Sequence, residues 1–200
     1  MIGGRPGVWL SRSTDLRGWA APEPVFGPRP GWWDSARVGI GPPPIETPEG
    51  WLVIYHGVRD TTAGALYRVG LLLLDLGNPT VVRARAAEWV LGPSEPYELT
   101  GNVPGVVFPV GLTHQSDTGE LRLYYGAANT CIAMATARLP AVLTHLLTQQ
   151  TPEPRRPLDR VPPPRPLENL PRINAEGTEG VINDDDNRWT GGLRPRLHRH

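Results

Sequence analysis

GIGPPPIETPEGWLVIYHGV, residues 39–58, joins a glycine- and proline-rich turn to an apolar run that ends in Tyr55-His56-Gly57. The run is short and bounded by turn residues, which favours a β-strand. His56 then stands at the end of a strand that hydrophobicity alone would bury. Two interpretations stay open for His56: a core or interface histidine whose hydrogen bonds are satisfied, and a residue of a binding site.

Runs of the same strand-like kind recur before residue 139, each bounded by Gly, Pro, Asn or Asp. They are GVWLSRS (7–13), WLVIYHGV (51–58), LYRVGLLLLDL (66–76), TVVRARA (80–86), GVVFPVGLTH (105–114), ELRLYYGA (120–127) and TCIAMATARL (130–139). Because no long helical period lies between them, the pattern predicts an antiparallel all-β fold rather than a βαβ sheet. Only LPAVLTHLLTQQ, residues 139–150, indicates a helix.

Two of these runs resemble one repeated unit. GWLVIYHG (50–57) and ELRLYYGA (120–127) both follow a polar turn. Both finish with an aromatic residue, a polar residue and glycine, Tyr55-His56-Gly57 in the first and Tyr124-Tyr125-Gly126 before Ala127 in the second. Such repetition favours a β-propeller over a plain sandwich. A propeller gathers one end of its innermost strands around a central channel, and His56 and Asn129 stand at strand ends of that kind.

Composition limits the function classes. The chain has 200 residues, is 39% hydrophobic and carries no formal net charge, and all 20 positive charges are arginines. This balance argues against a nucleic-acid-binding surface. The sequence has no membrane-length apolar stretch, and its single cysteine, Cys131, cannot form an intramolecular disulfide, so a cytoplasmic setting is expected.

The composition changes near residue 139, and the region 150–200 is rich in proline and charge and poor in apolar residues. Such a segment has too little apolar surface to offset its ordering entropy, so we expect a disordered tail after a domain that spans residues 1–149. A metal site at Asp184-Asp185-Asp186 or at the histidines of the C-terminus is a less favoured interpretation than a solvated charge run.

Five ordered segments together resemble glycoside hydrolase family 130, the mannoside phosphorylases. They are WWDSARVGIGPPP (32–44), GWLVIYHGV (50–58), YRVGLLLLDLGNPTVVRAR (67–85), EPYELTGNVPGVVFPVG (95–111) and LRLYYGAANTCIAMATARL (121–139). The resemblance covers about residues 7–148. It implies part of a five-bladed β-propeller, about half of the blades. It also implies phosphorolysis of β-mannosidic bonds in manno-oligosaccharides, which releases α-mannose 1-phosphate with inversion and needs no cofactor besides inorganic phosphate.

The resemblance also implies site residues. Arg37, His56 and Tyr67 match the family's phosphate-binding positions, although the family commonly has lysine where this chain has Arg37. A guanidinium keeps the positive charge and can bind phosphate through two hydrogen bonds.

Sugar binding is implied for three further residues, Glu98, Phe108 and Asn129. From pattern alone, Glu98 has the alternative role of capping a turn, and Phe108 that of plain core. Asn129 replaces the aspartate of the family's YYGAAD motif, so an amide with two donors stands where the family has an acceptor-only carboxylate.

No residue of this chain matches the family's general acid, an aspartate of the family's first half, so the resemblance implies no catalytic residue here. The sequence therefore leaves three hypotheses: the C-terminal half of a β-mannoside phosphorylase, a non-catalytic carbohydrate- or phosphate-binding remnant, and a glycoside hydrolase of the same fold. Open sheet edges in half a propeller lead us to expect a partner, either a complementary chain or a second copy in a homo-oligomer.

Overall fold

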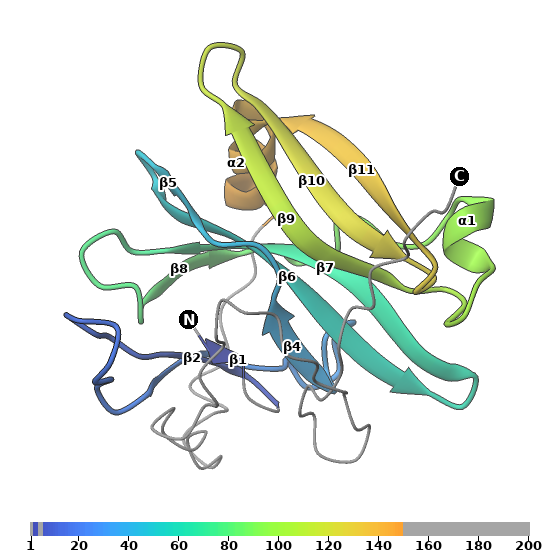
Figure 1. The fold of residues 1–200 in the computed structure, drawn as a ribbon, viewed down its shortest axis with the longest axis horizontal. Coiled ribbons are helices and arrows are strands. Elements are labelled where there is room, and N and C mark those ends of the chain that lie inside the picture. The colour runs from blue at the N-terminus through green and yellow to red at the C-terminus, as the bar shows by residue number, and fades with distance from the viewer. Residues whose placement is uncertain (1, 4–5, 150–200) are drawn as a thin grey trace, which may run out of the picture. The chain divides into compact units, whose positions relative to one another are not determined.

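Residues 2–3 and 6–149 are described by a computed structural model, and within them the chain forms three antiparallel sheets and two helices (Figure 1). The predicted tail, 150–200, lies outside the described residues. None of the helices in the described part of the chain is long and apolar enough to cross a membrane.

The first sheet has the strand order β1-β2-β3, and the last sheet has the order β9-β10-β11. Between them in the chain, the central sheet has the order β4-β6-β7-β8, with β5 also paired to β6. The strands are β1 (Ile2–Gly3), β2 (Val8–Leu10), β3 (Glu23–Phe26), β4 (Arg37–Ile40), β5 (Ile45–Thr47), β6 (Gly50–Thr61), β7 (Gly64–Leu74), β8 (Val82–Arg85), β9 (Val107–Gln115), β10 (Glu120–Ala127) and β11 (Cys131–Arg138). The helices are α1 (Pro96–Leu99) and α2 (Leu139–Thr148).

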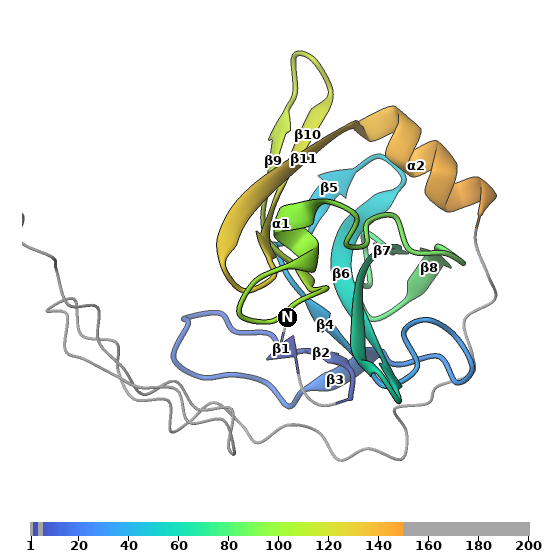
Figure 2. The same ribbon diagram turned by 90° about the vertical axis from the view of Figure 1, so that its right-hand side faces the viewer.

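The central sheet is buried on both faces. Alternate residues of β6 point to opposite sides, so Val53 and Tyr55 pack with the first sheet while Leu52 and Ile54 pack with the last sheet. A strand covered on both faces needs apolar residues at every position, which explains the unbroken runs in β6 and β7. Figure 2 shows α2 at one end of this arrangement, and its Leu143 and Leu146 are buried in the core between the central and last sheets.

All seven predicted strands and the predicted C-terminal helix are confirmed, with shifted ends. The prediction that His56 ends its strand is wrong, because β6 continues to Thr61 and the long β6–β7 hairpin places His56 in its interior. Five short elements, β1, β3, β4, β5 and α1, were not predicted. β4 pairs with β6 through Gly39 and Ile40, so the bend expected to begin at Gly39 falls later, at residues 41–44.

The two segments predicted to be repeats occupy equivalent places. β6 lies between β4 and β7, and β10 lies between β9 and β11, so each is an inner strand of its sheet. The fold is mostly β with few helices, as predicted. The sheets formed by residues 2–3 and 6–149 are open, and their closure into a propeller is not seen in this part of the chain.

Candidate functional site

The register of the central sheet brings Arg37, His56 and Tyr67 to one face. Arg37 pairs with Val58, and Val58 pairs with Tyr67, so Arg37 and Tyr67 flank β6 in one row. His56 stands two residues earlier on β6 and therefore points to the same side of the sheet. We call these three residues the Arg37 cluster.

Direct contacts join the three residues of the Arg37 cluster. The Arg37 Nη2 atom donates a hydrogen bond to the Tyr67 hydroxyl oxygen at 2.9 Å, and the guanidinium carbon lies 5.6 Å from the centre of the Tyr67 ring. The ring centres of His56 and Tyr67 are 6.3 Å apart, with an angle of 24° between the ring planes. The tyrosine therefore contacts both the cation and the imidazole, so the sequence-predicted phosphate residues are neighbours in space.

A glycine and an aromatic ring hold His56 in place. A Cβ atom on Gly39 would lie 2.4 Å from Cε1 of His56, so only glycine lets β4 pass this close to the imidazole. On its other side, the Phe108 ring on β9 lies 4.4 Å from the His56 ring, centre to centre. The Pro109 carbonyl oxygen would lie 2.2 Å from a Cβ on Gly41, so the turn after β4 packs directly against β9.

His56 is held in its neutral form. Burial lowers the pKa of His56 to about 4, and the positive charge of Arg37 adds to this shift. The Nδ1 atom is buried and has no hydrogen-bond partner among the described residues. At neutral pH the imidazole carries one N–H donor and one acceptor, so the positive charge of the Arg37 cluster resides on Arg37 alone.

Glu98 has the capping geometry that we considered as its alternative role. It is 1% exposed, and its Oε2 atom accepts hydrogen bonds from the backbone N–H groups of Ser94 at 2.7 Å and Glu95 at 2.9 Å. The Tyr125 hydroxyl donates to Oε1 at 2.6 Å. Burial raises the pKa of Glu98, but these donors stabilise the carboxylate and the pKa is lowered overall. A sugar-binding role for Glu98 stays a prediction.

Phe108 and Asn129 lie at the same end of the last sheet. Phe108 is 37% exposed, so the alternative of plain core is wrong for this residue. Asn129 is exposed in the turn between β10 and β11, where Ala128 and Asn129 have positive φ angles of 48° and 51° and Thr130 N–H donates to the Ala127 oxygen at 3.0 Å. This is a type I′ hairpin turn, and asparagine tolerates it well. Asn129 therefore suits the turn whatever its role toward a sugar.

Comparison with known proteins places these residues in a family. The family described as beta-1,4-mannooligosaccharide phosphorylase, glycoside hydrolase 130, matches residues 4–147. The chain belongs to glycoside hydrolase family 130. Its relatives include a beta-1,4-mannooligosaccharide phosphorylase of Ruminococcus albus, 39% identical over 139 residues, and a 1,2-beta-oligomannan phosphorylase of Thermoanaerobacter, 44% identical over 130 residues. These matches cover 70% and 65% of this chain but only 41% and 42% of the relatives.

The fold of this chain is also similar to that of a solved member of family 130. The beta-1,2-mannobiose phosphorylase of Listeria innocua, determined in complex with beta-1,2-mannobiose, is 38% identical with a TM-score of 0.64. The match covers 70% of this chain and 38% of that structure. The chain thus spans about two fifths of the length of its family-130 relatives.

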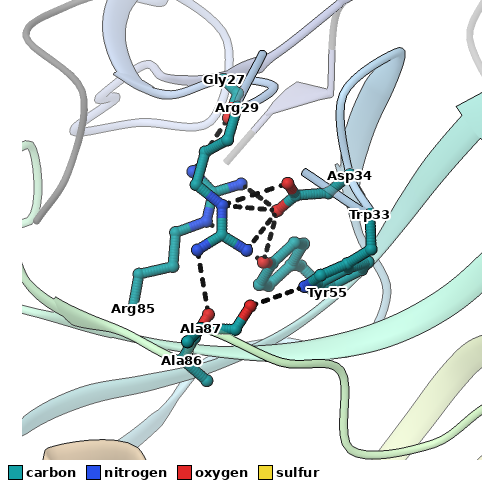
Figure 3. Close-up of polar contacts among 8 residues, drawn as sticks. All are labelled: Gly27, Arg29, Trp33, Asp34, Tyr55, Arg85, Ala86 and Ala87. Atoms are coloured by element: carbon teal, nitrogen blue, oxygen red, sulfur yellow. Dashed lines mark hydrogen bonds and ion pairs between the residues drawn. The ribbon is translucent and has the colours of Figure 1, made fainter. Parts of the chain in front are cut away.

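Sequence reasoning missed a buried polar network on the opposite face of β6, drawn in Figure 3. In what we call the Asp34 network, Asp34 Oδ2 accepts hydrogen bonds from Arg85 Nη2 at 2.8 Å, from the Tyr55 hydroxyl at 2.9 Å and from Arg29 Nε at 3.0 Å. Arg29, Asp34 and Arg85 are at most 1% exposed. The sequence offered one sign of this network: the segments WWDS and VRAR carry charged residues within otherwise apolar surroundings.

The Asp34 network ties three segments together. Arg85 Nη1 donates to the Gly27 carbonyl oxygen at 2.9 Å and Arg29 Nη1 to that of Ala86 at 3.0 Å, which joins the loop before β4 to the end of β8. Burial raises the pKa of Tyr55, as does the negative charge of Asp34, so the tyrosine stays a neutral donor. Since Tyr55 precedes His56 on β6, the network fixes the strand that carries the imidazole.

Proposed function

We propose that this chain carries the phosphate-binding part of a β-mannoside phosphorylase, with Arg37, His56 and Tyr67 as ligands of inorganic phosphate. The observation that carries the proposal is the convergence of a cation, a neutral imidazole and a phenol on one face of the central sheet. The names of the relatives, which are phosphorylases of mannosides, support the same reaction.

The cluster suits the charge and geometry of a phosphate nucleophile. Arg37 supplies the positive charge and N–H donors, and Tyr67, which accepts from Arg37, keeps its own hydroxyl proton to donate. Neutral His56 supplies one more N–H donor. These groups would hold the anion so that one of its oxygens faces the anomeric carbon of the sugar.

In the proposed reaction a phosphate oxygen forms a bond to the anomeric carbon of a β-mannoside while the bond to the bridging oxygen breaks. The bridging oxygen takes up a proton, and the product is α-mannose 1-phosphate, with inversion. Inorganic phosphate is the co-substrate and the reaction needs no cofactor. We assign the proton donor to no residue of this chain. Phe108, Asn129 and Glu98 are proposed for the sugar side, with Phe108 in direct contact with His56.

A non-catalytic binding protein is the second candidate. Asn129 favours it, because an amide replaces the carboxylate expected to accept hydrogen bonds from the sugar. Binding of phosphate or mannosides without release of mannose 1-phosphate would separate this candidate from the enzyme.

We further propose that the three sheets are blades of a five-bladed propeller and that a partner polypeptide or a second copy packs on the last sheet. Ile132 and Met134 on β11 are 68% and 51% exposed and alternate with Ala133 and Ala135, which pack on the core. Phe108 pairs across Gly126 with Ile132, so this apolar face is continuous with the Arg37 cluster. We also propose a cytoplasmic setting, which the single cysteine led us to expect.

Calorimetric titration of the 200-residue chain with inorganic phosphate, at constant ionic strength and pH 7, tests the phosphate site. Arg37→Gln is expected to weaken binding about tenfold or more, because it removes the charge-assisted hydrogen bonds. Arg59→Gln is the matched control, since Arg59 is an exposed arginine of the same strand β6. Equal affinities for both variants, or no saturable binding by the wild type, would overturn the proposal.

A further inference from the structure

Asp60 stands beside the Arg37 cluster and has no role in the function proposed above. It lies on β6 two residues beyond Val58, hence on the face that carries Arg37, His56 and Tyr67. Its Oδ1 atom is 3.6 Å from Arg37 Nη1, and its side chain is 67% exposed, against 32% for that of Arg37. A carboxylate therefore already faces the guanidinium from the solvent side.

The contact between Asp60 and Arg37 is an ion pair without a short hydrogen bond. The separation of 3.6 Å exceeds a hydrogen-bond length, whereas Arg37 Nη2 and the Tyr67 hydroxyl oxygen lie 2.9 Å apart. The guanidinium is thus anchored through Nη2 by Tyr67 and held loosely through Nη1 by Asp60. An anion could take the place of the carboxylate at Nη1 without disturbing the anchor.

The charges of the Arg37 cluster and of Asp60 cancel. Arg37 is the positive residue of its cluster, His56 is neutral, and Asp60 contributes one negative charge. An arriving phosphate dianion must therefore displace the carboxylate from Arg37 and also overcome its repulsion. Both effects weaken the affinity of the site for the anion.

We infer that Asp60 is an intramolecular competitor that occupies the Arg37 guanidinium when phosphate is absent and limits the affinity of the site for phosphate. The inference rests on the proposed phosphate site. Asp60 acts through Arg37 and is a positioning residue. When the anion leaves, the carboxylate returns to the guanidinium and keeps it in place beside Tyr67.

Titration of the 200-residue chain with inorganic phosphate at constant ionic strength tests this role. Asp60→Asn is expected to bind phosphate roughly two- to fivefold more tightly, the range that an exposed ion pair of this kind provides. Asp60→Glu keeps the carboxylate and should retain the wild-type affinity. Asp117→Asn, in the exposed turn between β9 and β10, removes the same charge elsewhere and should change nothing. The gain should also vanish when Arg37→Gln is added to Asp60→Asn.

The outcomes separate the two proposals. If the wild type binds phosphate and Asp60→Asn binds no more tightly than Asp117→Asn, the competitor role is wrong and the phosphate site stands. A gain that persists with Arg37→Gln would also overturn the role, since it would not act through the guanidinium. If neither the wild type nor Asp60→Asn binds phosphate, both proposals fail together.

Discussion

His56 is a histidine whose surroundings exclude its charged form. Its ring lies against the backbone of Gly39 and the ring of Phe108, and burial, with the positive charge of Arg37, lowers its pKa to about 4. A neutral imidazole suits a site that donates a hydrogen bond to an anion without exchanging a proton with it at neutral pH.

This environment makes stability depend on pH. In the unfolded chain His56 titrates near 6.5, whereas in the folded chain it titrates at about 4, so the unfolded state binds more protons between these values. The stability that depends on a neutral His56 is fully present above pH 6.5 and is lost as the pH falls toward 4. The loss in the free energy of unfolding amounts to at most about 3 kcal/mol. We expect the stability difference between the wild type and His56→Gln to shrink across this window in urea unfolding. A difference that stays constant from pH 7 to pH 4 would contradict the assignment.

Gly39 is required by the position of the imidazole. A Cβ atom there would lie 2.4 Å from Cε1 and 2.8 Å from Nε2 of His56, so Gly39→Ala must displace the ring or the strand. We predict a loss of about 1–3 kcal/mol in the free energy of unfolding, typical of overpacking, together with weaker phosphate binding. Gly77→Ala is the matched control, because Gly77 is exposed in the turn between β7 and β8 and a Cβ atom there would meet nothing closer than 3.5 Å. Unchanged phosphate affinity in folded Gly39→Ala would show that the ring position is unimportant for the site.

At the scale of the elements, the Asp34 network joins the loop before β4, the strand β6 and the end of β8. Asp34→Asn leaves two buried guanidinium groups facing an amide in place of a carboxylate. We expect the free energy of unfolding to fall by about 3–5 kcal/mol, as for other broken buried ion pairs. Chemical denaturation measures the loss, and Asp117→Asn serves as the control for removal of an exposed aspartate. A loss below about 1 kcal/mol would mean that the network does not hold these segments together.

The elements also show what could be predicted from sequence. β6, β7 and β10 are long, apolar and bounded by turn residues, so their existence and type followed from pattern. β4 reads RVGI, four residues with a charge and a glycine, and its strand character comes from pairing with β6. This strand carries Arg37, so its pairing with Val58 and its distance from Tyr67 could not be inferred from a local pattern.

The site residues likewise divide into those that the sequence could predict and those that it could not. The proximity of Arg37, His56 and Tyr67 is consistent with the family resemblance, whereas the ion pair of Arg37 with Asp60 depends on the register of β4 against β6. Glu98 was equally compatible with a sugar and with a cap, and α1 was too short to predict. The buried Arg29 and Arg85 are paired across more than 50 residues with backbone carbonyl groups, which no sequence window contains.

At the scale of the whole molecule, the central sheet is covered on both faces, while Ile132 and Met134 leave apolar side chains exposed on the last sheet. We predict that Met134→Lys lowers association with a partner or second copy but changes the free energy of unfolding of the isolated chain by no more than about 0.5 kcal/mol. Sedimentation velocity measures the association and urea unfolding measures the stability. A strongly destabilised, unassociated variant would indicate that Met134 belongs to the core of this chain.

The central claim is that inorganic phosphate binds against His56 beside Arg37. The most direct measurement is the change in imidazole nitrogen chemical shifts of the 200-residue chain during a phosphate titration at pH 7, with His56 assigned by the loss of its signal in His56→Gln. We predict a saturable shift of His56 that is abolished by Arg37→Gln, while the exposed His114 does not respond. An unmoved His56 signal, or parallel drift of all histidine signals with ionic strength, would contradict the account.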